Sequence, residues 1–384
     1  MCSEMPEERE RPDEPEQPDE RVRPEAAGGA APARAAGPRG TVDVVALGES
    51  MVTFVPSQPG PLADVPAFRR SIGGAESNVA CTLARAGHTA RWISRVGDDG
   101  FGDHLLAEIA ASGVDVSAVQ RDPRRPTGVY FRTAGERVTT PLAAAPGGIP
   151  APRPEVAYYR KGSAASALSP ALVRRREAWS GRVLHLTGIT GALSATCRAL
   201  MRRLTHPEPG RPLVSFDVNH RPALWQGADP WLLADLARGC DLVFVGEDEA
   251  QAAWGLRDAD AVRAALPEPA ALVVKRGAAG AVAFTAEGRT EMPAPAVDVV
   301  AHVGAGDAFA AGYLSATLRG LPTVLRLRHG HLMAAAALTV PGDLAAPPAR
   351  ARLDELAGLD DRAWRSLRLA PGWTGGDGVR GADG

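Results

Sequence analysis

One glycine-rich stretch organises this chain: Val303-Gly304-Ala305-Gly306-Asp307-Ala308-Phe309-Ala310-Ala311-Gly312-Tyr313-Leu314. It predicts a helix whose first residues are small. The first amides of a helix have no partner within the helix and carry partial positive charge, so such an end binds anions, above all phosphate. Asp307 could act beside that anion as a general base. It could also be an ordinary first-turn helix acid, and the stretch alone leaves both interpretations open.

Length and composition exclude several classes of protein. The 384 residues suit one large α/β domain with appendages, or two domains. A formal net charge of −2 gives no basic surface for nucleic acid. No apolar run approaches the roughly 20 residues of a membrane helix, so we expect no membrane partner. The N-terminus lacks the apolar core of a secretory signal, and the four cysteines have no metal-site spacing, so we expect a reducing, cytoplasmic location.

The two ends of the chain differ from its middle. Residues 1–40 mix acidic residues, proline, alanine and glycine without periodicity, which predicts a disordered tail. Residues 358–384 are predicted to be a second tail, largely disordered. The folded part is therefore expected at residues 41–357.

From Arg182 onward, apolar strands alternate with helices, which predicts a mostly parallel sheet covered on both faces. Ligands of such sheets bind beyond the carboxyl ends of the strands. Four candidate motifs follow predicted strands at that edge: Asp217–Arg221, Glu247–Glu249, Lys275–Gly280 and Gly304–Asp307. Their convergence favours a phosphate-handling site, and hence Asp307 as a base, more strongly than any one of them does.

A second, smaller sheet is predicted nearer the N-terminus. Residues 127–132 and 156–160 are short alternating strands, in which Tyr130 shares a face with Arg132 and Tyr158 with Arg160. Nearer the N-terminus, Gly73-Gly74 precedes a helical pattern. These glycines would let the backbone approach a ligand closely, and Asn78 could hydrogen-bond that ligand or simply lie on the surface.

These motifs together resemble the ribokinase-like (PfkB) carbohydrate kinases. The resemblance rests on Gly304-Ala305-Gly306-Asp307 followed by Ala308-Phe309, on Gly73-Gly74-Ala75 with Asn78, and on Lys275-x-Gly277-x-x-Gly280, and it covers about residues 42–356. Further stretches resemble 2-keto-3-deoxygluconate kinases: Gly48-Glu49-x-Met51, residues 158–164 and residues 216–225. Fructokinase-like relatives share variants of the last stretch.

The resemblance implies a fold and its cofactors. The fold is α/β and ribokinase-like, with a mostly parallel central sheet covered by helices on both faces. A small β lid would be built from about residues 51–70, 127–132 and 156–160. The domain of residues 41–357 would use ATP and Mg²⁺. Because lid sheets in this family often pair between subunits, we expect a homo-oligomer through the lid strands.

The resemblance also implies residue roles. Asp307 would take the proton of the sugar's terminal hydroxyl, and the amides of Gly304, Ala305 and Gly306 would form the anion hole. Substrate contacts would come from Gly74, Asn78, Tyr130, Arg132, Arg221 and Asp343. Nucleotide contacts would come from Asn219, Lys275, Gly277, Gly280 and His331, and the metal contact from Glu249. On the residues alone, Arg132 and Arg160 could instead be solvated, His331 could be a packed histidine, and Lys275 could bury only its stem.

A carboxylate substrate calls for arginines, because their paired N–H donors match its two oxygens. We therefore predict ATP-dependent phosphorylation of 2-keto-3-deoxygluconate or a similar sugar acid. The alternatives are a fructokinase-like kinase of a neutral sugar, and a weakly active or inactive member that binds sugar acids as a sensor. Ala301-His302 replaces an acid-containing pair typical of relatives, and Gly246 replaces their Asn or Ser, so activation by a monovalent cation is in question.

Overall fold

A computed structural model describes residues 41–58, 60–133, 156–342, 344–375 and 379–380. Residues 40–384 form one compact unit, and the fold below is that of this unit. The predicted tail of residues 1–40 lies outside the described residues. No helix in the described ranges is both long and apolar enough to cross a membrane.

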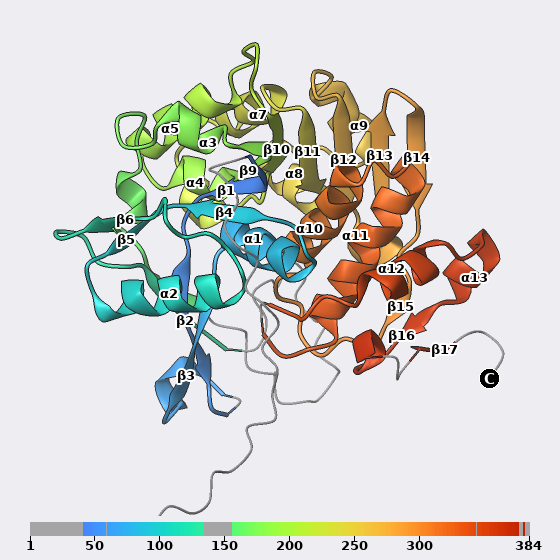
Figure 1. Ribbon diagram of the computed structural model, residues 1–384, viewed down its shortest axis with the longest axis horizontal. Coiled ribbons are helices and arrows are strands. Elements are labelled where there is room, and N and C mark those ends of the chain that lie inside the picture. The colour runs from blue at the N-terminus through green and yellow to red at the C-terminus, as the bar shows by residue number, and fades with distance from the viewer. Residues whose placement is uncertain (1–40, 59, 134–155, 343, 376–378, 381–384) are drawn as a thin grey trace, which may run out of the picture. The chain divides into compact units, whose positions relative to one another are not determined.

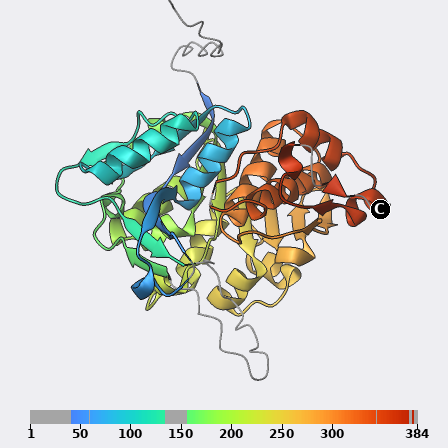
Figure 2. The same cartoon turned by 90° about the horizontal axis from the view of Figure 1, so that it is seen from below.

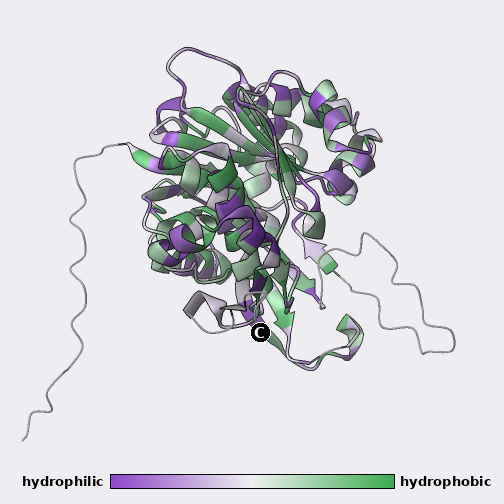
Figure 3. Ribbon diagram, turned by 90° about the vertical axis from the view of Figure 1, so that its right-hand side faces the viewer, coloured by the Kyte–Doolittle hydropathy of each residue, from purple (hydrophilic) through white to green (hydrophobic). Residues whose placement is uncertain are grey.

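The core of the fold is an eight-stranded sheet in the order β14-β13-β12-β11-β10-β9-β1-β4. Its strands from β4 to β12 pair in parallel, and β13 and β14 form an antiparallel edge. The strands are apolar runs, as in Val44–Leu47, which is wholly buried, and Figure 3 shows apolar residues gathered in them. The strand bounds are β1 (Val42–Leu47), β4 (Ala90–Ile93), β9 (Gly181–Thr187), β10 (Leu213–Asp217), β11 (Leu242–Gly246), β12 (Ala271–Lys275), β13 (Ala281–Thr285) and β14 (Gly288–Met292).

Helices cover both faces of this sheet (Figures 1 and 2). Side chains alternate along each strand, so Val44 packs in the cluster that includes Phe309, while Val45 packs in the one that includes Leu200. On the first face lie α1 (Ala75–Arg85), α10 (Ala305–Leu318), α11 (Thr323–Leu338) and α12 (Arg350–Ala357); on the second lie α5 (Ala195–Thr205), α7 (Trp231–Arg238), α8 (Glu247–Trp254) and α9 (Ala259–Ala265). The predicted doubly covered, mostly parallel sheet is confirmed.

A separate four-stranded sheet has the order β3-β2-β7-β8, and we call it the lid sheet. Its strands are β2 (Met51–Pro56), β3 (Phe68–Gly73), β7 (Val129–Arg132) and β8 (Val156–Tyr159). Strand β2 follows β1 after a short turn, and Met51 pairs with Gly73 just before α1. This confirms the predicted small sheet and places its inner end beside the start of α1. Residues 134–155 lie outside the described residues.

The unit has further elements outside the two sheets and their covering helices. They are the β5 (Arg95–Gly97) and β6 (Gln120–Asp122) pair, α2 (Gly100–Ala111), α3 (Arg175–Ala178), α4 (Gly188–Ala192), α6 (Pro222–Trp225) and the 3-10 turns at Leu62–Asp64, Ala165–Ala167 and Gly277–Ala279.

The C-terminal segment corrects one prediction. Residues 358–384 were expected to be largely disordered, but the structure has α13 (Asp361–Ser366), β16 (Arg368–Leu369) and a 3-10 turn at Trp373–Gly375. Strand β16 pairs with β15 (Ala296–Val297) and β17 (Val379–Arg380). Trp364 and Trp373 are 1% and 0% exposed in the main core. A glycine-rich composition hid the few apolar side chains that anchor this segment.

Candidate functional site

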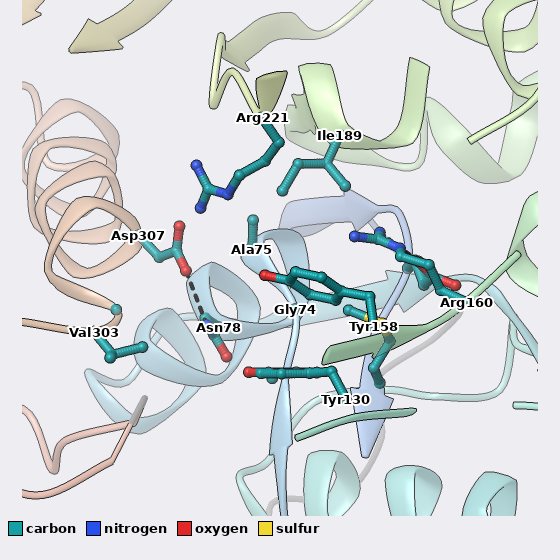
Figure 4. Close-up of a pocket in the computed structure, with 14 residues that line it drawn as sticks. Gly74, Ala75, Asn78, Tyr130, Tyr158, Arg160, Ile189, Arg221, Val303 and Asp307 are labelled. Atoms are coloured by element: carbon teal, nitrogen blue, oxygen red, sulfur yellow. Dashed lines mark hydrogen bonds and ion pairs between the residues drawn. The ribbon is translucent and has the colours of Figure 1, made fainter. Parts of the chain in front are cut away.

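A cavity lies where the lid sheet, α1, α4 and α10 meet (Figure 4). It brings together six residues that the sequence predicted: Gly74, Asn78, Tyr130, Arg221, Gly304 and Asp307. Its other lining residues are Glu49, Met51, Gly73, Ala75, Tyr158, Arg160, Ile189 and Val303.

The start of α10 forms one wall of the cavity. Gly304 is the N-cap residue, with φ of 73° and no side-chain cap. This left-handed conformation favours glycine. The first turn is formed from small residues, Ala305 and Gly306, so its amides are uncovered by long side chains. An uncapped helix start with small residues is suited to holding an anion.

Asp307 lies in the first turn of α10 and projects into the cavity. The side-chain amide of Asn78 donates to its Oδ2 at 2.9 Å. Burial, helped by the negative charge of Asp217, raises the pKa of Asp307 to about 7, against the lowering effects of Asn78, Arg221 and Lys275. A carboxylate with a pKa near the working pH is suited to general base catalysis.

The sequence left open whether Arg160 is solvated, and the structure places it in the lining of the cavity. Its Nε donates to Oε2 of Glu49 at 2.8 Å, and Nη2 also contacts that oxygen. Ser163 donates to the other carboxylate oxygen of Glu49. Only 10% of the Arg160 side chain is exposed. Arg160 is therefore paired with Glu49 at the cavity wall.

Arg221 approaches the cavity from the loop after β10. Figure 4 shows its guanidinium pointing toward Asp307, and its Nη1 lies 3.9 Å from Oε1 of Glu249. The cavity thus holds two arginines, but they are Arg160 and Arg221. Arg132, which we expected to contact the substrate, is 6% exposed and is not among the residues that line this cavity.

Lys275 ends β12 next to the start of α10. Its Nζ donates to both carboxylate oxygens of Asp217, at 3.0 and 2.8 Å. A Cβ built on Gly306 would lie 3.6 Å from this ammonium. The lysine therefore does more than bury its stem, because its charge lies beside the first turn of α10.

The other predicted nucleotide residues lie outside the cavity lining. Gly277 and Gly280 have positive φ in the turn after β12. Asn219 is buried with φ of 40°. His331 packs against Phe309, with ring centroids 5.2 Å apart, and burial lowers its pKa to about 4. His331 is therefore a packed, neutral histidine, which is one of the two interpretations that the sequence allowed. Asp343 lies outside the described residues.

Glu249, the predicted metal residue, is engaged in its own helix. Its Oε2 accepts from the backbone N–H of Gly246 at 2.9 Å, which caps α8. No group of three or more His, Cys, Asp or Glu in the described part of the chain could hold a metal ion by itself.

Glu49 and Ser163 lie in stretches of family resemblance but were given no role from the sequence, and the buried residue Glu76 was not singled out. Glu49 is 2% exposed although it is charged, and its partners lie more than a hundred residues away in the chain. The signals for Glu49 were its position in the Gly48-Glu49-x-Met51 stretch and an acidic residue shortly after the first strand.

Comparison with known proteins gives the same family throughout. The profile of the pfkB family carbohydrate kinases matches residues 42–350. A 2-dehydro-3-deoxygluconokinase of Bacillus subtilis (strain 168) is 35% identical over 320 residues, which are 81% of this chain and 94% of that protein. One of Thermoproteus tenax is 34% identical over 320 residues, with 82% and 94% covered.

A solved structure agrees in fold and sequence. The PfkB protein from Polaromonas sp. JS666 superposes with a TM-score of 0.69 at 35% identity, covering 82% of this chain and 99% of that one. The family profile spans the strands, the lid sheet and the helix start that carries Asp307. The chain therefore belongs to the pfkB family of carbohydrate kinases.

Proposed function

We propose that this carbohydrate kinase transfers the γ-phosphoryl group of ATP to the terminal hydroxyl of 2-keto-3-deoxygluconate or a similar sugar acid. The observation that carries the proposal is the convergence of Arg160, Arg221 and Asp307 on one cavity at the start of α10. The relatives named for this substrate support it.

The proposed chemistry uses the residues in place. Asp307 takes the hydroxyl proton as the sugar oxygen attacks the γ-phosphorus, and the bond to the ADP oxygen breaks. The amides of Gly304, Ala305 and Gly306 stabilise the charge on the transferring group, with Lys275 beside them. Arg160 and Arg221 orient the sugar through its carboxylate, since a guanidinium matches two carboxylate oxygens. Gly74, Asn78 and Tyr130 contact the rest of the sugar.

We further propose that Asn219, Gly277, Gly280 and Lys275 lie on the nucleotide side. Magnesium would be held by the phosphates of ATP and by water, with Glu249 acting through a water, and it would neutralise phosphate charge. Asp343 remains a predicted substrate contact. The three cysteines in the described residues, Cys81, Cys197 and Cys240, are buried free thiols, which supports a cytoplasmic location.

The test is ADP release with a panel of sugars and sugar acids, with Asp307→Asn as the inactive control. Turnover of the keto acid well above fructose is the expected result. Turnover of fructose alone would contradict the assignment of an acid substrate and favour the fructokinase-like alternative. That alternative is supported by the pairing of Arg160 with Glu49 and of Arg221 with Glu249, because each arginine already has a carboxylate partner within the protein. Binding of the keto acid without ADP release would favour the sensor.

A charge variant sharpens the substrate assignment. Arg160→Gln should raise KM for the sugar acid about tenfold to a hundredfold, because hydrogen bonds between charged groups contribute about 1.5–3 kcal/mol. KM for a neutral sugar should change little. Arg69→Gln, at an exposed position of the same lid sheet, is the matched control.

We also propose that the lid sheet pairs with that of a second copy. Its outer face carries a row of aromatic rings: Phe54 stacks on Phe131 with centroids 4.6 Å apart, and Phe68 and Tyr159 pack at its sides. Tyr159, on the edge strand β8, is 66% exposed. Tyr159→Glu should shift the protein toward monomer in light scattering, and an unchanged mass for the two proteins would exclude this interface.

A further inference from the structure

A buried carboxyl group that the proposed chemistry does not use lies under the cavity. Glu76 is the second residue of α1, between Ala75 and Asn78, which both line the cavity. It is 0% exposed. Ionisable side chains are almost never fully buried without a partner, so its surroundings have to explain why an acid is here.

The first contact of Glu76 is with the segment that follows β9. Its Oε1 accepts from the hydroxyl of Thr187 at 2.7 Å and from that of Thr190 at 2.6 Å. Thr187 is also the N-cap residue of α4 and accepts from the backbone N–H of Ile189 at 3.2 Å. Ile189 lines the cavity. One carboxyl oxygen thus fixes the turn that carries Ile189.

The second contact of Glu76 is with the end of β1. A Cβ built on Gly48 would lie only 2.1–2.5 Å from the carboxyl atoms of Glu76, so the carboxyl group packs directly on this glycine. The carbonyl of Gly48 accepts a hydrogen bond from the indole N–H of Trp92 at 3.2 Å. The next residue, Glu49, holds Arg160. Three segments of the cavity wall therefore meet at the Glu76 carboxyl.

The groups around Glu76 act on its charge in opposite directions. In the described part of the chain, buried Oε2 has no hydrogen-bond partner to compensate a negative charge, whereas Oε1 accepts two hydroxyls, which favour the ionised form. Burial raises the pKa of Glu76 to about 7, against the lowering effects of both threonines and of the Arg160 charge. The other titratable groups nearby are Glu49 and the thiol of Cys197, whose pKa burial raises to about 11.

We propose that Glu76 is a positioning residue that holds the sugar cavity together in its protonated form, and that losing its proton opens the cavity and draws Arg160 away from the sugar. The buried negative charge would seek water and a counter-ion, and Arg160 is the cation that acts on it. This rests on the proposed function, because Arg160 is assigned to the sugar acid there. Sugar binding should therefore weaken with rising pH while the chemical step does not.

The test is KM for the sugar acid between pH 6 and 8.5 at saturating ATP. If only the protonated form binds, about half of the protein is competent at pH 7 and about a tenth at pH 8, so KM rises about fivefold over that unit. Glu76→Gln keeps the carbonyl and cannot ionise, so its KM should stay flat. Wild type and variant share the ionisation of ATP, which cancels in the comparison. Equal KM profiles for the two proteins would overturn the proposal.

A second variant serves if Glu76→Gln folds poorly. Thr190→Val removes a hydroxyl that favours the ionised acid, so the rise in KM should move to higher pH, while Thr190→Ser should leave it in place. If KM of the Thr190→Val variant rises at the same pH as KM of the wild type, the proposed role of Glu76 is contradicted.

Melting temperature gives a readout that needs no turnover. Since the folded pKa lies above the unfolded value, this group's stabilising effect is lost as pH rises from about 5 to 8, and Glu76→Gln should lack that loss. If no sugar is turned over, the proposed function fails, and this melting comparison still decides the protonation state.

Discussion

Asp307 and Asn78 are the pair on which the rate should depend. A general base works only when deprotonated, and the pKa of Asp307 is raised to about 7 by burial. We predict that kcat falls about tenfold for each pH unit below that value. Measuring kcat at saturating ATP and sugar between pH 5.5 and 8.5 tests this, and a flat profile down to pH 5.5 would rule Asp307 out as the base.

The raised pKa of Asp307 also determines whether this group makes the protein more or less stable as pH rises. The folded protein holds this proton more tightly than the unfolded chain, whose carboxyl has the ordinary value of 3.8. The group's stabilising contribution is therefore complete below about pH 4 and is lost as pH rises through about 7. Asp307→Asn should be inactive yet lose less stability than wild type between those values, as chemical denaturation at pH 5 and 8 would reveal.

Asn78 should tune the base as well as line the cavity. Its amide donates to Asp307 at 2.9 Å and lowers the pKa of that carboxyl. Asn78→Ala should move the acid limb of the kcat profile to higher pH, and Asn78→Asp should move it further because two carboxylates repel. An unmoved limb with a raised KM would instead mean that Asn78 contacts only the sugar.

At the scale of elements, the start of α1 is packed with no space to spare against the β1–β2 turn. A Cβ on Gly74 would lie 2.5 Å from the carbonyl oxygen of Glu49 and 2.7 Å from Cα of Ser50. Gly74→Ala should push α1 outward, destabilise the protein by about 1–3 kcal/mol and raise KM. Gly100→Ala is the matched control, because nothing lies within 4 Å of its added Cβ. Equal stability of the two variants in urea would contradict this packing argument.

The lid strands explain what the sequence could and could not predict. The two-residue period of side chains predicted the small sheet and the shared face of Tyr130 and Arg132, whereas apolar strands alternating with helices predicted the main sheet. The sequence pattern did not predict which residues of the lid strands line the cavity. Strands β7 and β8 are antiparallel, with Tyr130 opposite Tyr158, so the chain leaves the cavity on its way to Arg132 and returns to it on its way to Arg160.

The partners of the cavity residues were hidden for a different reason. Glu49 meets Arg160 across 111 residues of sequence, and Glu76 meets Thr187 across the same separation. No periodicity or local spacing marks such pairs. Asp307 and the glycines before it could be predicted as a site because the residues that form a helix start are adjacent in the sequence.

At the scale of the whole molecule, we predict that the folded unit needs the segment after Gly358 for its stability. Trp364 is 1% exposed, and its indole N–H donates to the carbonyl of Pro293 at 2.9 Å. Trp364→Ala should cost about 3–5 kcal/mol, whereas Trp231→Ala, at a site 43% exposed, should cost much less. Ending the chain after Gly358 should destabilise it similarly, and ending it after Gly375 should not. Thermal melts of the four proteins would test this, and a stable chain ending at Gly358 would contradict it.

The hydrogen bond between Asn78 and Asp307 joins residues 229 positions apart. A ribosome adding about 5–20 residues per second needs roughly 10–50 seconds to make that intervening chain, and closing so long a loop carries an entropic cost that only later packing repays. Asp307 therefore meets its partner amide only once the chain has been synthesised at least as far as α10. A nascent chain that ends before Asp307 cannot form this pair, so it has no assembled centre with which to consume ATP.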